Sequence, residues 1–163
     1  MGYTTDFNGI LQLSKPATEE QMEYLNRFSN TRRMKRMPDI LHKKHMGKYG
    51  LDGNYGIDGE YFCMDDGNYG QNEDASIIDY NKQPSTQPSL WCQWILSDAE
   101  TLQWDGSEKF YCYVPWLQYL IDNFFNYLGI KLNGEITWQG EDNDDMGKII
   151  VTDNVIEVLK GVY

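Results

Sequence analysis

The chain has 163 residues, a net charge of -11 and 24% charged residues. This length suits one domain with its own hydrophobic core and is short for two, so we expect a single domain over residues 1–163. The negative charge argues against general nucleic-acid binding, which depends on attraction to phosphates. No apolar run approaches the roughly 20 residues that span a bilayer, and the start of the chain lacks the layout of a secretion signal, so we expect a cytoplasmic protein without a membrane segment.

The first part of the chain predicts a strand followed by a helix. Residues 5–13 alternate as a strand does, and Gly9 within them marks a bulge or a close approach of the backbone. Thr18 and Gln21 form a capping box, and apolar residues at helical spacing predict a helix from residue 19 to about residue 30.

A proline interrupts the chain after this helix, and a glycine-rich region follows. Asp39 can start a short helix that runs to about Met46, because Pro38 disfavours helical structure before it. Residues 49–75 are rich in Gly, Asp and Tyr and read as a loop region of tight Asp-Gly turns, with residues 61–64 its most strand-like part. A calcium site is conceivable there, but turn-forming aspartates are the commoner use.

The middle of the chain predicts two further strands before the second helix. A short strand is expected at residues 77–80, followed by a polar loop. The nearly continuous apolar run at residues 90–96 is typical of a strand in the middle of a sheet, and residues 101–104 are its expected partner.

The second helix is predicted over residues 114–129. Its apolar residues recur at helical spacing, Pro115 suits the first turn, and Gly129 suits the end. Beyond it the pattern is that of hairpins, with a two-residue Asn133-Gly134 turn. The predicted strands are residues 130–132, 135–139, 148–152 and 155–159, with an acidic loop at 140–147.

Together these elements predict an α+β fold. We expect a mostly antiparallel sheet of about six strands, with two main helices packed on one face. The three cysteines, an odd number without a CxxC pair, are interpreted as reduced structural thiols, because each has apolar or aromatic neighbours. They are Cys63, Cys92 and Cys112.

A basic segment in this acidic chain is the best candidate site. Residues 27–48 hold eight of the 14 Lys and Arg against one acid, a local charge of +7 that leaves -18 for the remainder. Guanidinium groups suit bidentate contact with phosphate or carboxylate oxygens. The candidate ligand-binding residues are Arg32, Arg33, Lys35 and Arg36. The alternative is that this segment pairs internally with the acidic loops at 52–74 or 141–145.

Two segments contain residue types that bind metals, but metal binding is predicted at neither. His42 and His45 lie three apart but have no third ligand at a fixed spacing. The loop at residues 141–145 matches a calcium-binding loop only in part, since Met146 occupies a ligand position and strands flank it. We predict no metal and no cofactor.

Four blocks that cover much of the chain carry a resemblance to other sequences. They are FSNTRRMKR (28–36), DYNKQPSTQPSLWCQW (79–94), WDGSEKFYCYVPWLQY (104–119) and NGEITWQGEDNDDMGKIIVTDN (133–154). These blocks resemble a family of small uncharacterised proteins from bacteria and their phages. The resemblance implies a setting, that of a phage or mobile-element accessory protein, and it implies no activity and no site residues.

Three functions are compatible with these patterns. The first is a non-enzymatic binding protein, such as an inhibitory or sequestering protein, whose basic segment contacts a phosphate-bearing small molecule such as a nucleotide. The second is an acidic surface that docks onto a basic face of a host protein, such as a nucleic-acid enzyme. The third is an enzyme that acts on a nucleotide derivative with groups brought together from distant segments, such as Asp39, His42 or His45.

Overall fold

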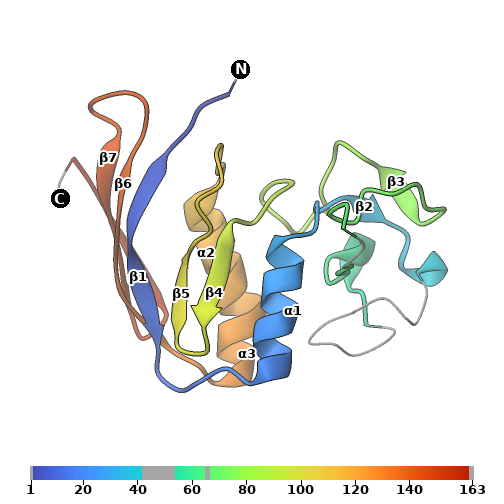
Figure 1. The fold of residues 1–163 in the computed structure, drawn as a ribbon, viewed down its shortest axis with the longest axis horizontal. Coiled ribbons are helices and arrows are strands. Elements are labelled where there is room, and N and C mark those ends of the chain that lie inside the picture. The colour runs from blue at the N-terminus through green and yellow to red at the C-terminus, as the bar shows by residue number, and fades with distance from the viewer. Residues whose placement is uncertain (1, 42–53, 65–66, 162–163) are drawn as a thin grey trace. The chain divides into compact units, whose positions relative to one another are not determined.

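The computed structural model describes residues 2–41, 54–64 and 67–161, and the chain divides into two compact units (Figure 1). Unit 1 comprises Met1–Ala17 and Gln93–Tyr163, and unit 2 comprises Thr18–Cys92. Unit 2 is therefore inserted into the chain of unit 1, which is built from both ends of the sequence. The single domain expected from the chain length stays a prediction.

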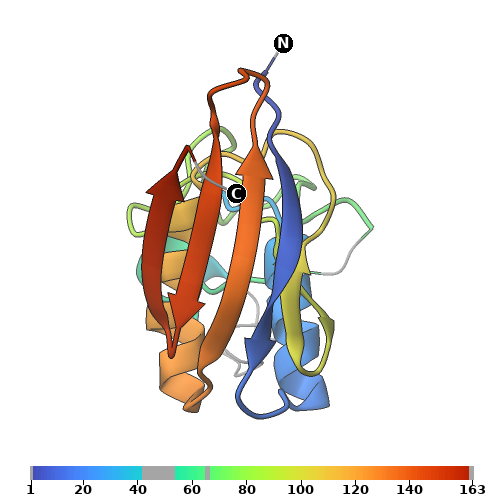
Figure 2. The ribbon, with the colours of Figure 1, turned by 90° about the vertical axis from the view of Figure 1, so that its left-hand side faces the viewer.

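Unit 1 is built on a six-stranded antiparallel sheet in the order β4-β5-β1-β6-β7-β8 (Figure 2). The strands are β1 Asp6–Leu13, β4 Trp94–Asp98, β5 Thr101–Trp104, β6 Leu132–Gln139, β7 Met146–Thr152 and β8 Val155–Lys160. Every neighbouring pair is antiparallel. The predicted α+β class and the predicted antiparallel sheet are confirmed. In the part of the chain that the structure describes, no helix combines the length and apolar character needed to cross a membrane.

One helical segment covers one face of this sheet, and Figure 2 looks onto the other face. It consists of α2 Tyr113–Leu120, a π-helical turn Ile121–Phe125 and α3 Asn126–Leu128. It ends at Gly129, whose left-handed conformation (φ 69°, ψ 25°) closes the last turn as predicted. The side chains that it buries are Trp116, Leu117, Tyr119, Leu120, Ile121, Phe124 and Phe125. The π-helical turn was not predicted, because such turns are rare and the apolar spacing was interpreted as that of one α-helix.

Two glycines allow the central strands β1 and β6 to pair closely. Gly9 lies opposite Ile136 and Gly134 lies opposite Leu11. A Cβ atom at Gly9 would collide with the carbonyl oxygen of Glu135, and one at Gly134 would lie 2.5 Å from the carbonyl oxygen of Ile10. Both residues also have positive φ angles, 117° and 149°. The close approach predicted for Gly9 is confirmed.

Two of the predicted strand boundaries are wrong. The Asn133-Gly134 pair makes no hairpin turn, because β6 runs through it and pairs with β1 on one side and β7 on the other. The apolar run at residues 90–96 contributes only its second half to β4, and β4 is an edge strand. By contrast, β5 has the predicted bounds, and Asp153 and Asn154 form the two-residue turn between β7 and β8 with positive φ angles.

Unit 2 contains one α-helix, a small two-stranded sheet and irregular loops. Its elements are α1 Glu19–Ser29, β2 Lys35–Arg36, a 3-10 turn Pro38–Ile40, a 3-10 turn Ile57–Gly59 and β3 Ile77–Asp79, with β2 antiparallel to β3. The predicted capping box is present: Gln21 N donates to Thr18 Oγ1 (3.1 Å) and Thr18 N donates to Gln21 Oε1 (2.9 Å).

The region between these two strands is only partly described. The predicted helix from Asp39 to Met46 begins as a short 3-10 turn, and its part beyond Leu41 lies outside the described residues, as do residues 49–53 and 65–66 of the loop region. Residues 61–64 form no strand beyond a single bridge residue. The Asp58-Gly59 pair does form a tight turn, with φ angles of 57° and 76°.

The close pairing of β1 and β6 can be tested with Gly9→Ala. We expect this change to lower the free energy of unfolding by about 3 kcal/mol, because the new Cβ meets backbone atoms that cannot move without breaking the sheet. Gly106→Ala is the matched control, since Gly106 also has a positive φ (84°) but open space around it. We expect the control to lose about 1 kcal/mol. Equal losses in urea unfolding would contradict this explanation.

Candidate functional site

The predicted basic segment lies in unit 2, between the end of α1 and the strand β2. Its backbone is held on one side by hydrogen bonds from Arg33 N to Leu90 O and from Lys35 N to Lys82 O, both 2.8 Å. This path turns Arg33 and Arg36 into the interior, where each is only 1% exposed, and leaves Arg32 and Lys35 partly exposed. The four predicted site residues are therefore not gathered on one surface.

Arg33 acts as a cross-link between α1 and the following loop. Its Nη1 donates to the carbonyl oxygen of Phe28 (3.1 Å), and its Nη2 donates to the carbonyl oxygens of Glu60 (3.2 Å) and Phe62. The guanidinium carbon lies 4.0 Å from the ring centroid of Phe28. Phe28 is in the last turn of α1, where a cation interacts favourably with carbonyl groups that have no partner within the helix.

Arg36 makes a similar cross-link to the next loop. Its Nη1 donates to Ser76 Oγ (3.0 Å) and its Nη2 donates to the carbonyl oxygen of Gly70 (2.6 Å). Its guanidinium carbon lies 3.9 Å from the ring centroid of Phe62. The expectation that these two arginines face outward toward an anion is corrected: they bind main-chain oxygens inside unit 2, because buried carbonyl groups need donors.

The two remaining residues of the basic segment lie at the surface. Arg32 donates to the carbonyl oxygen of Tyr80 (2.9 Å) and to Asn81 Oδ1 (3.3 Å), and its guanidinium carbon lies 5.9 Å from the ring centroid of Trp91. Lys35 Nζ lies 3.9 Å from Asp58 Oδ2. This last contact is of the internal kind considered as the alternative, a cation paired with an acid of the loop at 52–74.

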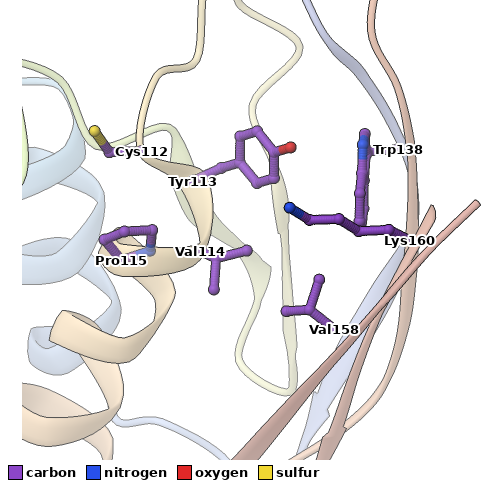
Figure 3. Close-up of a pocket in the computed structure, with 7 residues that line it drawn as sticks. All are labelled: Cys112, Tyr113, Val114, Pro115, Trp138, Val158 and Lys160. Carbon is purple, nitrogen blue, oxygen red and sulfur yellow. The ribbon is translucent and has the colours of Figure 1, made fainter. Parts of the chain in front are cut away.

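Unit 1 contains a cleft of about 400 Å³ that the sequence analysis did not predict (Figure 3). It opens between the first turn of α2 and the strands β6 and β8. The lining residues are Cys112, Tyr113, Val114, Pro115, Trp138, Val158 and Lys160. All come from unit 1, and most of the lining is apolar.

A glycine in β7 makes room on the sheet side of this cleft. Gly147 lies opposite Trp138 on one neighbouring strand and opposite Lys160 on the other. A Cβ atom at Gly147 would lie 2.8 Å from Cζ2 of Trp138, so the indole ring occupies the space above the glycine. Any larger residue at position 147 would displace the ring from this wall of the cleft.

Hydrogen bonds hold the Trp138 ring in place. Its Nε1 donates to Asp145 Oδ1 (3.0 Å), and the other carboxylate oxygen accepts a hydrogen bond from the Tyr3 hydroxyl (2.6 Å). The hydrogen bond from Tyr3, then that from Trp138, lower the pKa of Asp145 below its ordinary value of 3.8, so the carboxylate is charged at neutral pH. Lys160 adds a smaller effect in the same direction.

Tyr113 stands at the same end of the cleft and remains protonated. Its ring packs against Phe7, Phe110 and Trp138, with ring centroids 4.9, 6.3 and 6.0 Å away. Burial, together with the negative charge of Asp145, raises the pKa of Tyr113 to about 12. At neutral pH the hydroxyl is therefore a hydrogen-bond donor held in a fixed position.

The cysteines differ in burial more than their sequence contexts predict. Cys63 and Cys92 are fully buried, and burial raises the pKa of the Cys63 thiol to about 11. Cys112 is exposed and has a left-handed conformation (φ 57°) just before α2, so its apolar and aromatic neighbours in the sequence do not bury it. Each of the three is free of disulfide bonds.

The places considered for metal binding have different outcomes. The acidic loop at 140–145 forms the connection between β6 and β7, as the hairpin interpretation predicted. The structure describes no group of three or more metal-ligating side chains in residues 2–41, 54–64 and 67–161. His42 and His45 lie outside these ranges.

One signal in the sequence could have pointed to the cleft. Ile156, Val158 and Lys160 alternate along one strand, so a lysine shares the inward face of β8 with two aliphatic residues. A cation on an otherwise apolar face is unusual, and here it lies at the edge of the cleft. Trp138 and Tyr113 carry no comparable signal, because aromatic residues in a strand or helix usually belong to the core.

Comparison with known protein families, with characterised proteins and with solved structures finds no match for this chain. The resemblance to small bacterial and phage proteins stays a prediction.

The structural role of Arg33 can be tested with Arg33→Lys. We expect a loss of about 3 kcal/mol in the free energy of unfolding, because lysine keeps the charge but cannot reach three carbonyl oxygens and stack on Phe28 at once. Arg32→Lys is the matched control at the partly exposed neighbour, with an expected loss below about 1 kcal/mol. If both variants unfold at the same denaturant concentration, Arg33 is not the cross-link described above.

Proposed function

We propose that this protein is a binding protein that takes a small organic molecule into the cleft of unit 1. One observation carries the proposal: a mostly apolar cleft of about 400 Å³ has the hydroxyl of Tyr113 and the ammonium group of Lys160 at one end (Figure 3). Small-molecule sites in proteins are typically concave and apolar with few polar groups, and have volumes of roughly 300–1,000 Å³. A non-enzymatic binding protein is also what the sequence predicted. The proposed binding site, however, is the cleft in unit 1 and not the basic segment.

Rigid walls support this proposal. Trp138 is held by Asp145, Tyr113 is held by three aromatic neighbours, and Pro115 lies in the first turn of a helix. Val158 faces the cleft from a paired strand. A site whose walls are fixed before the ligand arrives loses little conformational entropy on binding.

The cleft can be tested by filling it with Val158→Trp. The neutral probe 1-naphthamide is titrated into ¹⁵N-labelled protein, and the indole N–H signal of Trp138 is followed by NMR. We expect a saturable shift in the wild type and a loss of at least about tenfold in affinity in the variant, because its indole takes the space of the probe. Val114→Trp fills the same cleft from the helix and should have the same effect.

Val155→Trp is the matched control for this experiment. Val155 lies on the same strand, is 69% exposed and does not line the cleft. It should bind the probe as the wild type does. Probe-induced shifts that avoid Trp138, or that survive both cleft-filling changes, would refute the proposed site.

A second candidate function rests on the exposed part of the basic segment in unit 2. Arg32 lies over Trp91, and Tyr69, which is 48% exposed, packs its ring edge to face against Trp91 at 5.8 Å. Aromatic faces beside a cation suit a nucleotide, whose base stacks while its phosphate meets the positive charge. This keeps the phosphate-bearing ligand expected from the sequence, with Arg32 and Lys35 as its contacts.

The second candidate is tested by calorimetric titration of adenosine monophosphate. We expect Arg32→Ala and Trp91→Ala each to weaken binding by about tenfold or more, since stacking and a charged hydrogen bond are each worth roughly 1–3 kcal/mol. Arg27→Ala is the control, because Arg27 pairs with Glu23 on α1 (2.6 Å). Heats that are equal in all four proteins, or absent from the wild type, would exclude this site.

A further inference from the structure

Two hydrogen-bond donors converge at one end of the cleft in unit 1. Figure 3 shows the hydroxyl of Tyr113 and the ammonium group of Lys160 pointing toward the same space, with the apolar side chains of Val114 and Val158 near them. We infer that the ligand of this cleft is an organic monocarboxylate, with its carboxylate bound by Tyr113 and Lys160 and its apolar body against α2 and β8. This inference rests on the proposed function and names its ligand class.

Both donors are available to a ligand. Within the described residues, no hydrogen bond involves the Tyr113 hydroxyl, although the ring is packed on several sides. None of the ion pairs between described residues includes Lys160. The hydroxyl of Tyr113 is on a half-buried side chain, where a donor without a partner costs free energy that an acceptor supplied by a ligand recovers. Lys160 is exposed, and its contribution is the attraction of its charge for an anion.

The acceptor that fits both donors is an anion. A carboxylate accepts several hydrogen bonds and carries one negative charge, which matches one neutral O–H and one ammonium group. The raised pKa of Tyr113 keeps its proton in place at neutral pH, so the hydroxyl does not add a negative charge that would repel the ligand. A neutral ligand would gain no charge attraction from Lys160.

The surrounding charges limit the ligand to one negative charge. Asp145 is ionised close to this end of the cleft, where it acts on the pKa values of both Tyr3 and Tyr113 and is itself influenced by Lys160. Glu141, Asp142 and Asp144 belong to the same loop. Unit 1 as a whole has five Lys and Arg against 13 Asp and Glu, a net charge of -8. A phosphate monoester with two negative charges would meet stronger repulsion than a carboxylate.

The rest of the cleft favours a compact apolar body. The volume of about 400 Å³ lies near the lower end of the range for small-molecule sites. The walls are aliphatic on the side of α2 and β8 and aromatic at Trp138, so a short branched chain or a single aromatic system suits them. Larger lipids would exceed this space.

Three naphthalene derivatives of similar size separate the possibilities. The probes 1-naphthoate, neutral 1-naphthamide and doubly charged 1-naphthyl phosphate are titrated into the full chain at neutral pH, and affinity is measured by NMR and calorimetry. We expect naphthoate to bind at least about tenfold more tightly than either analogue. We expect Lys160→Met and Tyr113→Phe each to reduce naphthoate affinity by about tenfold and to reduce naphthamide affinity by much less, so that the preference for naphthoate narrows.

Lys131→Met controls for the general loss of one positive charge in unit 1, because Lys131 does not line the cleft. It should leave naphthoate binding unchanged. Equal binding of naphthoate and naphthamide, or tighter binding of the phosphate, would overturn the assignment of a monocarboxylate while leaving the proposed function intact. Absence of binding by all three probes would instead remove the proposed function itself, and with it this inference.

Discussion

The close contact between the backbones of β1 and β6 is the constraint on which unit 1 depends. It joins residues 6–13 to residues 132–139 over the full length of both strands, and glycines at positions 9 and 134 permit it. The strands β5 and β4 extend the sheet on one side, and β7 and β8 extend it on the other. The same pairing brings Tyr3, just before β1, to Asp145, just before β7, so the polar end of the cleft is assembled from distant parts of the chain.

Unit 2 differs from unit 1 because it contains irregular loops whose backbone groups need partners outside regular helices and strands. Its glycine-rich segments bury carbonyl groups that no regular strand or helix satisfies, and Arg33 and Arg36 supply the donors. Each guanidinium also lies over a phenylalanine ring, which fits its weak hydration better than it would fit an ammonium group. Because Arg33 and Arg36 are buried, their positive charges do not lie at the surface, and the surface of unit 2 is more acidic than its composition suggests. This matters for the second predicted function, docking of an acidic surface onto a basic partner, which stays a prediction.

The cleft in unit 1 depends on a glycine in the sheet as well as on the side chains that line it. Gly147 leaves space between two strands, Trp138 lies over that space, and Asp145 holds the indole through a hydrogen bond. Tyr113 is kept neutral by its surroundings, and Lys160 brings the one cation among the lining residues. These features give a fixed, mostly apolar space with two donors at one end, the arrangement on which the proposed ligand is argued.

Local chemistry in the sequence determined the capping box of α1, the end of the second helix at Gly129 and the turn at Asp153 and Asn154, because each depends on a few neighbouring residues. The predicted helices and strands together determined the α+β class. Only tertiary structure decided that Gly134 lies inside a strand, since its freedom from a side chain serves a partner strand far away in sequence. The direction of Arg33 and Arg36, and the meeting of Tyr113, Trp138 and Lys160, also required the fold. Burial and concavity arise from segments that pack together, and no single stretch of sequence encodes its neighbours.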